Sequence, residues 1–287
     1  MSPQAPPFTS APRLRSLLFV PGDRPGRMAK ALGSGADALI LDLEDSVALA
    51  AKANAREAIA VFLRQPRTIT LFVRVNPLDS GLMPDDLAAV LPARPDGIVL
   101  PKAEGRASLA AIDSELRDDV MILPIATETP AAIFTLGSYG GVTDRLCGLT
   151  WGAEDLPAAI GASSAREADG RYTPPYEMVR ALTLFGAHAA GVPAIETVYP
   201  DFRDTDGLAA YAARARRDGF TGMMAIHPAQ IPVINAAFAP SAAEIDHAQR
   251  IVAMFDAQPG AGVLTLDGKM IDAPHLKAAR RILAQRD

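Results

Sequence analysis

Eight short apolar segments, separated by longer helical segments, limit the fold of this chain more than any other feature of its sequence. The segments are mostly unbroken runs of Leu, Ile, Val and Met, as in parallel strands that other elements cover on both faces. Ala-rich amphipathic stretches at 48–63, 105–117, 175–190 and 206–218 are typical of helices between such strands. The predicted strands are residues 14–20, 38–43, 69–75, 97–100, 120–126, 145–151, 194–199 and 219–226.

This succession of strand–helix units predicts an α/β fold in which the strands close into a (β/α)₈ TIM barrel. We place the barrel at residues 13–237, after a flexible N-terminal tail at 1–12. Residues 238–287 are interpreted as a C-terminal helical arm. Its first helix follows the capping-box sequence SAAE at 241–244, and its last helix covers residues 274–284.

The composition excludes several classes of protein. The 28 basic and 33 acidic residues give a net charge of −5, which argues against binding to nucleic acid. A single cysteine, Cys147, permits neither an intrachain disulfide nor a zinc site built from cysteines, and we expect it to be a buried, inert thiol. No apolar run reaches the roughly 18 residues of a membrane-spanning helix, and the N-terminus does not resemble a signal peptide. We therefore expect a cytoplasmic protein that binds no membrane.

Polar and charged residues gather where five of the predicted strands end. In a barrel these strand ends meet on one face, and that face carries the catalytic groups. The segments concerned are residues 42–45 (DLED), 74–76 (RVN), 127–130 (TETP), 152–155 (GAED) and 227–228 (HP).

Two carboxylates in this set, Glu128 and Asp155, suit a magnesium or manganese ion, which prefers oxygen ligands and retains waters or substrate oxygens. Helix capping is the alternative for both positions, because Thr129 and Pro130 form a good helix start and Asp155 is itself a capping residue.

Arg74 suits a substrate carboxylate, since its guanidinium is planar and always charged. The alternative is a structural role as the buried partner of Asp42, Glu44 or Asp45, whose crowded negative charge requires a cation nearby. His227 is more often a packing or hydrogen-bonding residue than a catalytic one in such a position.

Seven blocks in this order resemble the citrate lyase β-subunit-like family of the HpcH/HpaI aldolase/citrate lyase superfamily, closest to its stand-alone malyl-CoA and citramalyl-CoA lyase branch. The resemblance covers nearly the whole chain from residue 13. The blocks are RSLLFVPG at 15–22, DLEDSV at 42–47, VRVN at 73–76, ETP at 128–130, GAEDL at 152–156, AIHP at 225–228 and GKMID at 268–272.

The resemblance implies a barrel that binds Mg²⁺ and makes or breaks a C–C bond beside an acyl thioester. It implies that Glu128 and Asp155 are the metal ligands and that Arg74 binds the substrate carboxylate. Glu44 and Asp45 would hold metal-bound water and the arginine. Backbone N–H groups of Ala153, Glu154 and Asp155, near the start of the next helix, are expected to contact the carboxylate as well.

The resemblance also implies that Asp272 is the acid/base and enters the site of a neighbouring subunit in a homotrimer or a hexamer. Its alternative is a cap for the final helix, with Pro274 in the first turn. Arg24 and Lys30 are candidate contacts for the phosphates of coenzyme A. The C-terminal extension, taken to be absent from short citrate lyase β-subunits, favours a stand-alone enzyme that uses free CoA thioesters.

The activity expected is therefore a Mg²⁺-dependent carbon–carbon lyase that converts malyl-CoA, citramalyl-CoA or citryl-CoA to acetyl-CoA and a 2-oxoacid, or the reverse. Three alternatives stay open: a CoA-independent, metal-dependent 2-oxoacid aldolase, a malyl-CoA thioesterase, and a non-catalytic barrel that serves binding or assembly. The fold alone does not identify the substrate.

Overall fold

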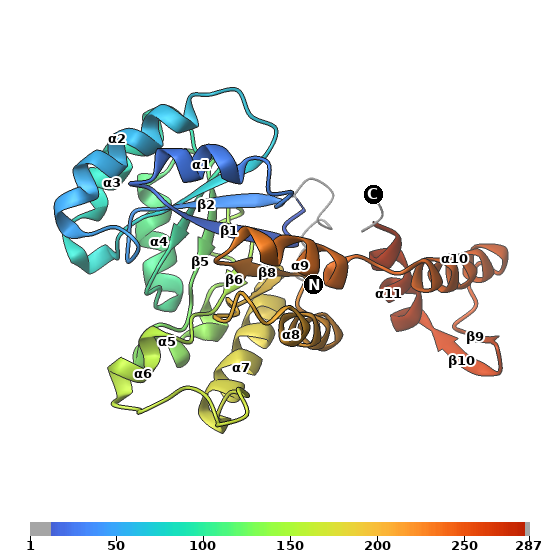
Figure 1. Cartoon of the computed structure of the whole chain (residues 1–287). Coiled ribbons are helices and arrows are strands. Elements are labelled where there is room, and N and C mark those ends of the chain that lie inside the picture. Colours follow the sequence, from blue (N-terminus) through green and yellow to red (C-terminus); the bar gives the residue numbers. More distant parts are fainter. Residues whose placement is uncertain (1–12, 285–287) are drawn as a thin grey trace. The chain divides into compact units, whose positions relative to one another are not determined.

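The eight predicted strands all form, and they wind into a nearly closed parallel barrel with helices around it (Figure 1). The computed structural model describes residues 13–284, so the tail predicted at 1–12 lies outside the described residues. The predicted TIM-barrel class is confirmed. In order around the sheet the strands are β5 (Met121–Pro124), β4 (Gly97–Leu100), β3 (Thr70–Arg74), β2 (Ala38–Asp42), β1 (Ser16–Pro21), β8 (Gly222–Ala225), β7 (Ala194–Glu196) and β6 (Leu149–Thr150).

The barrel closes between β5 and β6 through isolated parallel bridges instead of a continuous ladder. Ile122 pairs with Leu146, and Ile125 pairs with Thr150. Strand β6 is much shorter than the predicted segment 145–151. Only two residues of this segment pair with β7 in a regular ladder.

Nine α-helices of the described chain belong to the barrel region, and each helix predicted between the strands is among them. Five of them have eight residues or fewer. The bounds are α1 (Pro25–Ala31), α2 (Lys52–Leu63), α3 (Met83–Val90), α4 (Gly105–Glu115), α5 (Pro130–Ile133), α6 (Asp155–Ile160), α7 (Pro174–Ala190), α8 (Thr205–Asp218) and α9 (Ile231–Phe238). No described helix is long and apolar enough to cross a membrane.

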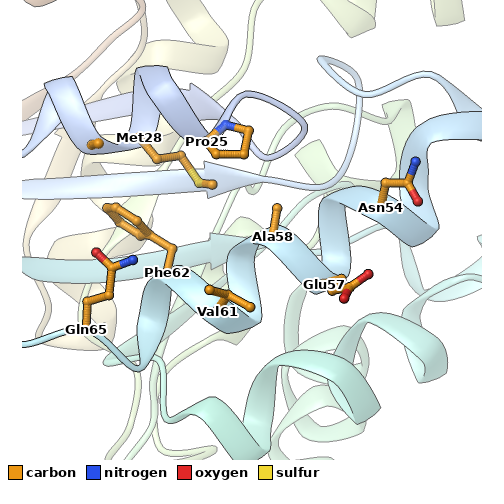
Figure 2. A pocket seen from close by; sticks show the side chains of 9 residues that line it. Pro25, Met28, Asn54, Glu57, Ala58, Val61, Phe62 and Gln65 are labelled. Atoms are coloured by element: carbon orange, nitrogen blue, oxygen red, sulfur yellow. The ribbon is translucent and has the colours of Figure 1, made fainter.

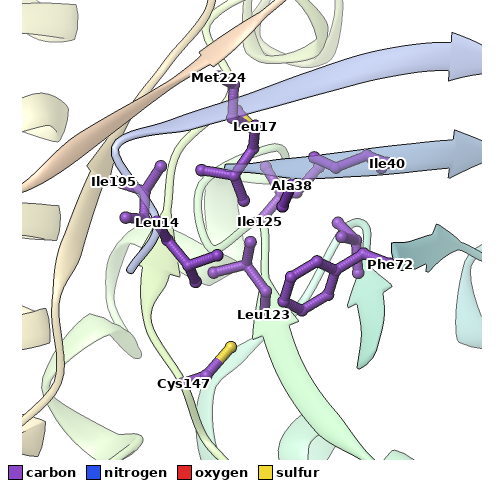
Figure 3. Close-up of a cluster of buried hydrophobic side chains, with 11 residues drawn as sticks. Leu14, Leu17, Ala38, Ile40, Phe72, Leu123, Ile125, Cys147, Ile195 and Met224 are labelled. Carbon is purple, nitrogen blue, oxygen red and sulfur yellow. The ribbon is translucent and has the colours of Figure 1, made fainter. Parts of the chain in front are cut away.

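Apolar side chains from the strands fill the barrel interior (Figure 3). Leu17, Ile40 and Phe72 come from β1, β2 and β3, and each is fully buried. Cys147 belongs to the same cluster, as expected for an inert thiol. Because this filling leaves no channel, chemistry is confined to the ends of the barrel.

Contacts divide the chain into one unit up to Ala237 and a second from Phe238. The second unit contains α10 (Ala242–Ala257), strands β9 (Val263–Leu266) and β10 (Lys269–Asp272), and α11 (Ala273–Ala284). The predicted capping box is present, since Ser241 Oγ accepts from Glu244 N at 3.2 Å and Ser241 N donates to Glu244 Oε2 at 2.8 Å.

Between the two helices of the second unit lies the antiparallel pair β9–β10, which the sequence analysis did not predict. Its turn residues, Asp267 and Gly268, have φ values of 52° and 76°. Two successive residues with positive φ form the tight turn that matches the twist of a hairpin, and Asp-Gly is a favoured sequence for it.

Candidate functional site

Charged side chains from the ends of five strands, β2 to β6, come together at the carboxyl-terminal end of the barrel. Asp42 and Arg74 end β2 and β3, while Lys102 and Glu128 follow β4 and β5 within a few residues. Asp155 lies in the connection after β6, at the start of α6. We call the five carboxylates of this group the acidic rim: Asp42, Glu44, Asp45, Glu128 and Asp155.

Arg74 forms a two-pronged ion pair with Asp42, its register partner on the adjacent strand. Nε donates to Oδ1 and Nη2 donates to Oδ2, each at 2.7 Å. The guanidinium also lies over the Phe19 ring, 4.9 Å from its centroid. Burial by itself would raise the pKa of Asp42, but the hydrogen bonds and charge of Arg74 outweigh it and hold that pKa below its ordinary value.

The same arginine reaches two further carboxylates. Nη1 lies 2.7 Å from Glu44 Oε2 and 3.9 Å from Asp45 Oδ2. Glu44 is buried, and burial raises its pKa although Arg74 and Lys102 oppose the shift. Arg74 thus has the structural partners that the sequence offered as one alternative. The Nη1 and Nη2 atoms of Arg74 each carry a second N–H, so the guanidinium can contact these residues and a substrate carboxylate at the same time.

Glu128 is buried beside the other carboxylates, and its Oε2 accepts a hydrogen bond from Lys102 N at 2.6 Å. Burial, followed by the charges of Glu44 and Asp155, raises the pKa of Glu128 from 4.5 to about 8. Helix capping does not account for Glu128, because the cap of α5 is Thr129, whose Oγ1 accepts from Ala132 N.

Asp155 is the first residue of α6, and Glu154 occupies the capping position without a side-chain cap bond. The Oδ1 atom of Asp155 lies 3.6 Å from Lys102 Nζ. Capping therefore does not explain Asp155. Of the two residues that precede Asp155, Ala153 is buried and Glu154 is exposed.

Gly152 allows Glu128 to lie against the backbone of the β6–α6 connection. A Cβ atom at Gly152 would stand 2.9 Å from Glu128 Cγ and 3.1 Å from Oε1. The connection is held by Thr127, whose Oγ1 pairs with both the N–H and the carbonyl of Gly152 at 3.0 and 3.1 Å.

Lys102 is the site residue that the sequence reasoning missed. Its ammonium contacts Glu44 Oε1 at 2.7 Å as well as Asp155, and its backbone has a left-handed φ of 50°. Burial would lower the pKa of Lys102, but the hydrogen bond to Glu44 raises it above the ordinary value. The other positions were identified because polar residues that follow parallel strands meet on one face of a barrel, and this reasoning applies equally to Lys102, which lies two residues after β4.

The acidic rim suits a divalent cation by charge and by donor chemistry. When all five carboxyl groups are ionised, they face two cationic side chains, Arg74 and Lys102, and the formal excess is three negative charges. Among residues 13–284 no group of three or more His, Cys, Asp and Glu side chains forms a ready set of metal ligands. Glu128 and Asp155 offer oxygen donors of the kind that Mg²⁺ takes, and this ion uses few protein ligands and completes its shell with water or substrate.

Asp272 belongs to the second unit, where it ends β10. Its Oδ1 contacts His275 Nδ1 at 2.5 Å, and this hydrogen bond holds the pKa of Asp272 below its ordinary value. In the hairpin register Asp272 lies opposite Val263. Both Val263 and Met270, which lies two residues before Asp272, are more than half exposed.

The remaining candidates lie apart from these contacts. Arg24 is largely exposed and pairs with Asp23 at 3.4 Å, and Lys30 lies in the last turn of α1. A groove between α1 and α2 lies nearby in sequence (Figure 2), but neither residue lines it. His227 has a structural role, since its Nδ1 accepts from Ala229 N and its ring stacks on Phe202.

Two curated relatives align with almost the whole chain. The (3S)-malyl-CoA thioesterase of Cereibacter sphaeroides is 36% identical over 99% of this chain and 96% of that protein. The citrate lyase subunit beta of Escherichia coli is 35% identical over 94% of this chain and 92% of its own length. The aligned 94% of this chain is longer than residues 1–237, so the alignment extends into the second unit. The expectation that citrate lyase β-subunits lack the C-terminal region is therefore wrong for this relative, and the extension does not separate the two branches.

Solved structures show the same fold, and the sequence resemblance is confirmed. The Mycobacterium tuberculosis CitE protein in complex with magnesium, acetoacetate and coenzyme A has a TM-score of 0.80 at 35% identity, covering 96% of this chain and 98% of that chain. The M. tuberculosis citrate lyase β subunit complexed with oxaloacetate and magnesium has a TM-score of 0.71 at 38% identity, covering 80% and 98%. Residues 15–228 match the sequence pattern of one family, and the chain belongs to it: the HpcH/HpaI aldolase/citrate lyase family.

Proposed function

We propose that this chain is a Mg²⁺-dependent carbon–carbon lyase that cleaves or forms a 3-hydroxyacyl-CoA such as malyl-CoA, citramalyl-CoA or citryl-CoA. The products of cleavage are acetyl-CoA and a 2-oxoacid. The observation that carries the proposal is the acidic rim, where carboxylates outnumber cations at the end of the barrel that supports catalysis. Relatives that bind magnesium, coenzyme A and small oxoacids support it.

Glu128 and Asp155 would hold the ion, with Arg74 on the substrate carboxylate. When bound, Mg²⁺ supplies Lewis acidity to the hydroxyl or keto oxygen of the substrate. Asp42 and Glu44 hold the guanidinium of Arg74 in one orientation, so it presents its outer N–H groups without a change of rotamer. Backbone N–H groups of Ala153, Glu154 and Asp155 would add contacts to the same carboxylate.

Asp272 would move the proton at carbon. In cleavage the substrate hydroxyl would lose its proton to solvent water, the C–C bond would break, and its electron pair would stay on the thioester fragment. The carbon of that fragment would take a proton from the protonated form of Asp272, which leaves Asp272 as the carboxylate and requires a new proton from solvent for the next turnover. In condensation Asp272 removes that proton from the acetyl methyl group. Since His275 lowers the pKa of Asp272, the carboxylate is ionised at neutral pH and ready for this second role.

The proposal includes assembly into a homotrimer or a hexamer in which Asp272 serves the barrel of a neighbour. Support comes from the exposed apolar side chains of Val263 and Met270 close to Asp272 on the hairpin, since such side chains favour a protein partner. Arg24 and Lys30 would contact the phosphates of coenzyme A.

The test is incubation of the full chain and Mg²⁺ with malyl-CoA, citramalyl-CoA and citryl-CoA, followed by chromatography of the products. We expect acetyl-CoA together with glyoxylate, pyruvate or oxaloacetate from at least one of these thioesters, and no reaction after chelation of the metal. Absence of any product across the three thioesters contradicts the proposal and favours a binding or assembly role.

A thioesterase activity is a second candidate, favoured by the relative of that name. The same base would activate water instead of a carbon acid, and malyl-CoA would then yield malate and free CoA. The products therefore separate the two activities. A CoA-independent aldolase would instead be stabilised against heat by pyruvate and Mg²⁺ but not by acetyl-CoA.

A further inference from the structure

A lysine ammonium lies within the acidic rim, at a place where a metal ion would find the same carboxylates. We propose that Lys102 is a positioning residue that arranges the acidic rim before the metal arrives and weakens its affinity for Mg²⁺ by competing for the same negative charge. The inference rests on the proposed function, because it concerns the cation that this function uses.

The contacts of Lys102 reach three connections of the barrel at once. Its backbone N–H donates to Glu128 Oε2 at 2.6 Å, and its Nζ lies 2.7 Å from Glu44 Oε1 and 3.6 Å from Asp155 Oδ1. Glu44 follows β2, Glu128 follows β5 and Asp155 follows β6. One residue thus orients both proposed metal ligands and a neighbouring carboxylate.

The backbone at Lys102 supports a function for its side chain. A φ of 50° lies in the left-handed region, which glycine adopts freely and other residues adopt at a cost. This conformation directs the N–H of Lys102 toward Glu128, which a glycine would do equally well. A lysine at this strained position therefore indicates that the ammonium, and not only the N–H, is required.

Charge explains how the ammonium acts. Without Lys102, the five carboxylates would face only the guanidinium of Arg74, and their mutual repulsion would destabilise the metal-free barrel. With Lys102 present, a metal ion binds beside a fixed positive charge, which opposes its approach. The ammonium therefore stabilises the metal-free site and lowers its cation affinity.

The experiment compares Mg²⁺ affinity, measured by isothermal titration calorimetry, in the full wild-type chain and in Lys102→Met. We expect Lys102→Met to bind Mg²⁺ about tenfold more tightly, the effect of removing one unit charge several ångströms from a divalent ion. Its melting temperature without metal should fall, and the rise on adding Mg²⁺ should exceed that of the wild type. Lys102→Arg should retain the wild-type affinity, because the charge is kept.

Lys277→Met is the matched control, since it removes an equal charge from an exposed position on α11 and should leave the affinity unchanged. If Lys102→Met does not fold, Lys102→Gln provides the same comparison. Equal or weaker Mg²⁺ binding by the neutral variants overturns the inference alone. A wild-type chain that binds no Mg²⁺ overturns the proposed function and this inference with it.

Discussion

Besides Arg74, two residues without a carboxylate, Lys102 and Gly152, contribute to the arrangement of the acidic rim. Lys102 sets the charge and orients Glu128 through its backbone N–H. Gly152 provides the space in which the Glu128 side chain lies. Metal sites depend on such neighbours, because ligands that are free to move bind a metal less tightly.

Replacing Gly152 by Ala should weaken Mg²⁺ binding by roughly tenfold while the chain still folds, because the new methyl group displaces the Glu128 side chain. Calorimetric titration of Mg²⁺ measures the change. Gly26→Ala is the control, since a Cβ atom there meets nothing within 4 Å and should not alter the affinity. Wild-type affinity in Gly152→Ala would contradict the role given to this glycine.

Cys147 should resist alkylation by iodoacetamide at mildly alkaline pH in the folded protein and react once urea unfolds it. Burial raises the pKa of its thiol from 9.0 to about 12. The folded state therefore keeps a proton that the unfolded state loses, and stability declines as pH rises through this interval. Mass spectrometry detects the adduct, and Cys147→Ala serves as the blank. Rapid labelling of the folded chain would show that the thiol is accessible.

At the scale of elements, a buried network joins β6, β7, α7 and α8 next to the site. Glu196, at the end of β7, accepts from Trp151 Nε1 at 2.5 Å, from Arg180 Nε at 2.7 Å and from the Tyr211 hydroxyl at 2.9 Å. Arg180 continues the network to Asp218 at 2.8 Å. Trp151 directly precedes Gly152, so the network anchors the connection that leads to Asp155.

Glu196→Gln should destabilise the protein by about 3 kcal/mol, because it leaves the buried Arg180 without its closest counter-charge. Urea unfolding followed by circular dichroism measures the loss. Asp169→Asn, which breaks the exposed pair with Arg171, should leave the free energy of unfolding nearly unchanged, because solvent screens this pair. Similar losses in the two variants would argue against a special role for the buried network.

At the scale of the whole molecule, the proposed chemistry requires residues from both units. Glu128 and Asp155 belong to the unit up to Ala237, whereas Asp272 belongs to the unit from Phe238. Under the proposed function, Asp272→Asn should lose turnover but retain binding of Mg²⁺ and 2-oxoacid, because its barrel is intact.

Co-expression of Asp272→Asn with Glu128→Gln should restore activity if the arm of one subunit serves the barrel of another. Random assembly of the two chains pairs an intact barrel with an intact arm at about a quarter of the sites. Steady-state turnover of the mixed assembly measures the recovery. Co-expression of Glu128→Gln with Asp155→Asn is the control, since no intact barrel can form. No recovery in the first pair would mean that each arm serves its own barrel or none.

Local patterns were sufficient to predict most of the fold. Continuous apolar runs identify buried parallel strands, and eight of them predict the barrel because each run and its flanking helix are encoded by neighbouring residues. The hairpin β9–β10 was missed because its strands have four residues each, too few for periodicity to indicate. The strand-end rule also located the acidic rim, since parallel strands bring their carboxyl ends to one face.

The sequence by itself determined the barrel, the family and the carboxylates of the rim, because these depend on composition, order and local periodicity. Only the tertiary structure decided which charges meet. Arg74 contacts Asp42 across 32 positions, Trp151 contacts Glu196 across 45, and Lys102 contacts Glu44 across 58. These contacts depend on how the barrel closes and on the direction of each side chain. A local sequence pattern predicts neither of these. The position of Lys102 just after β4 could have been predicted from the sequence, but its contacts with Glu44 and Asp155 are visible only in the tertiary structure.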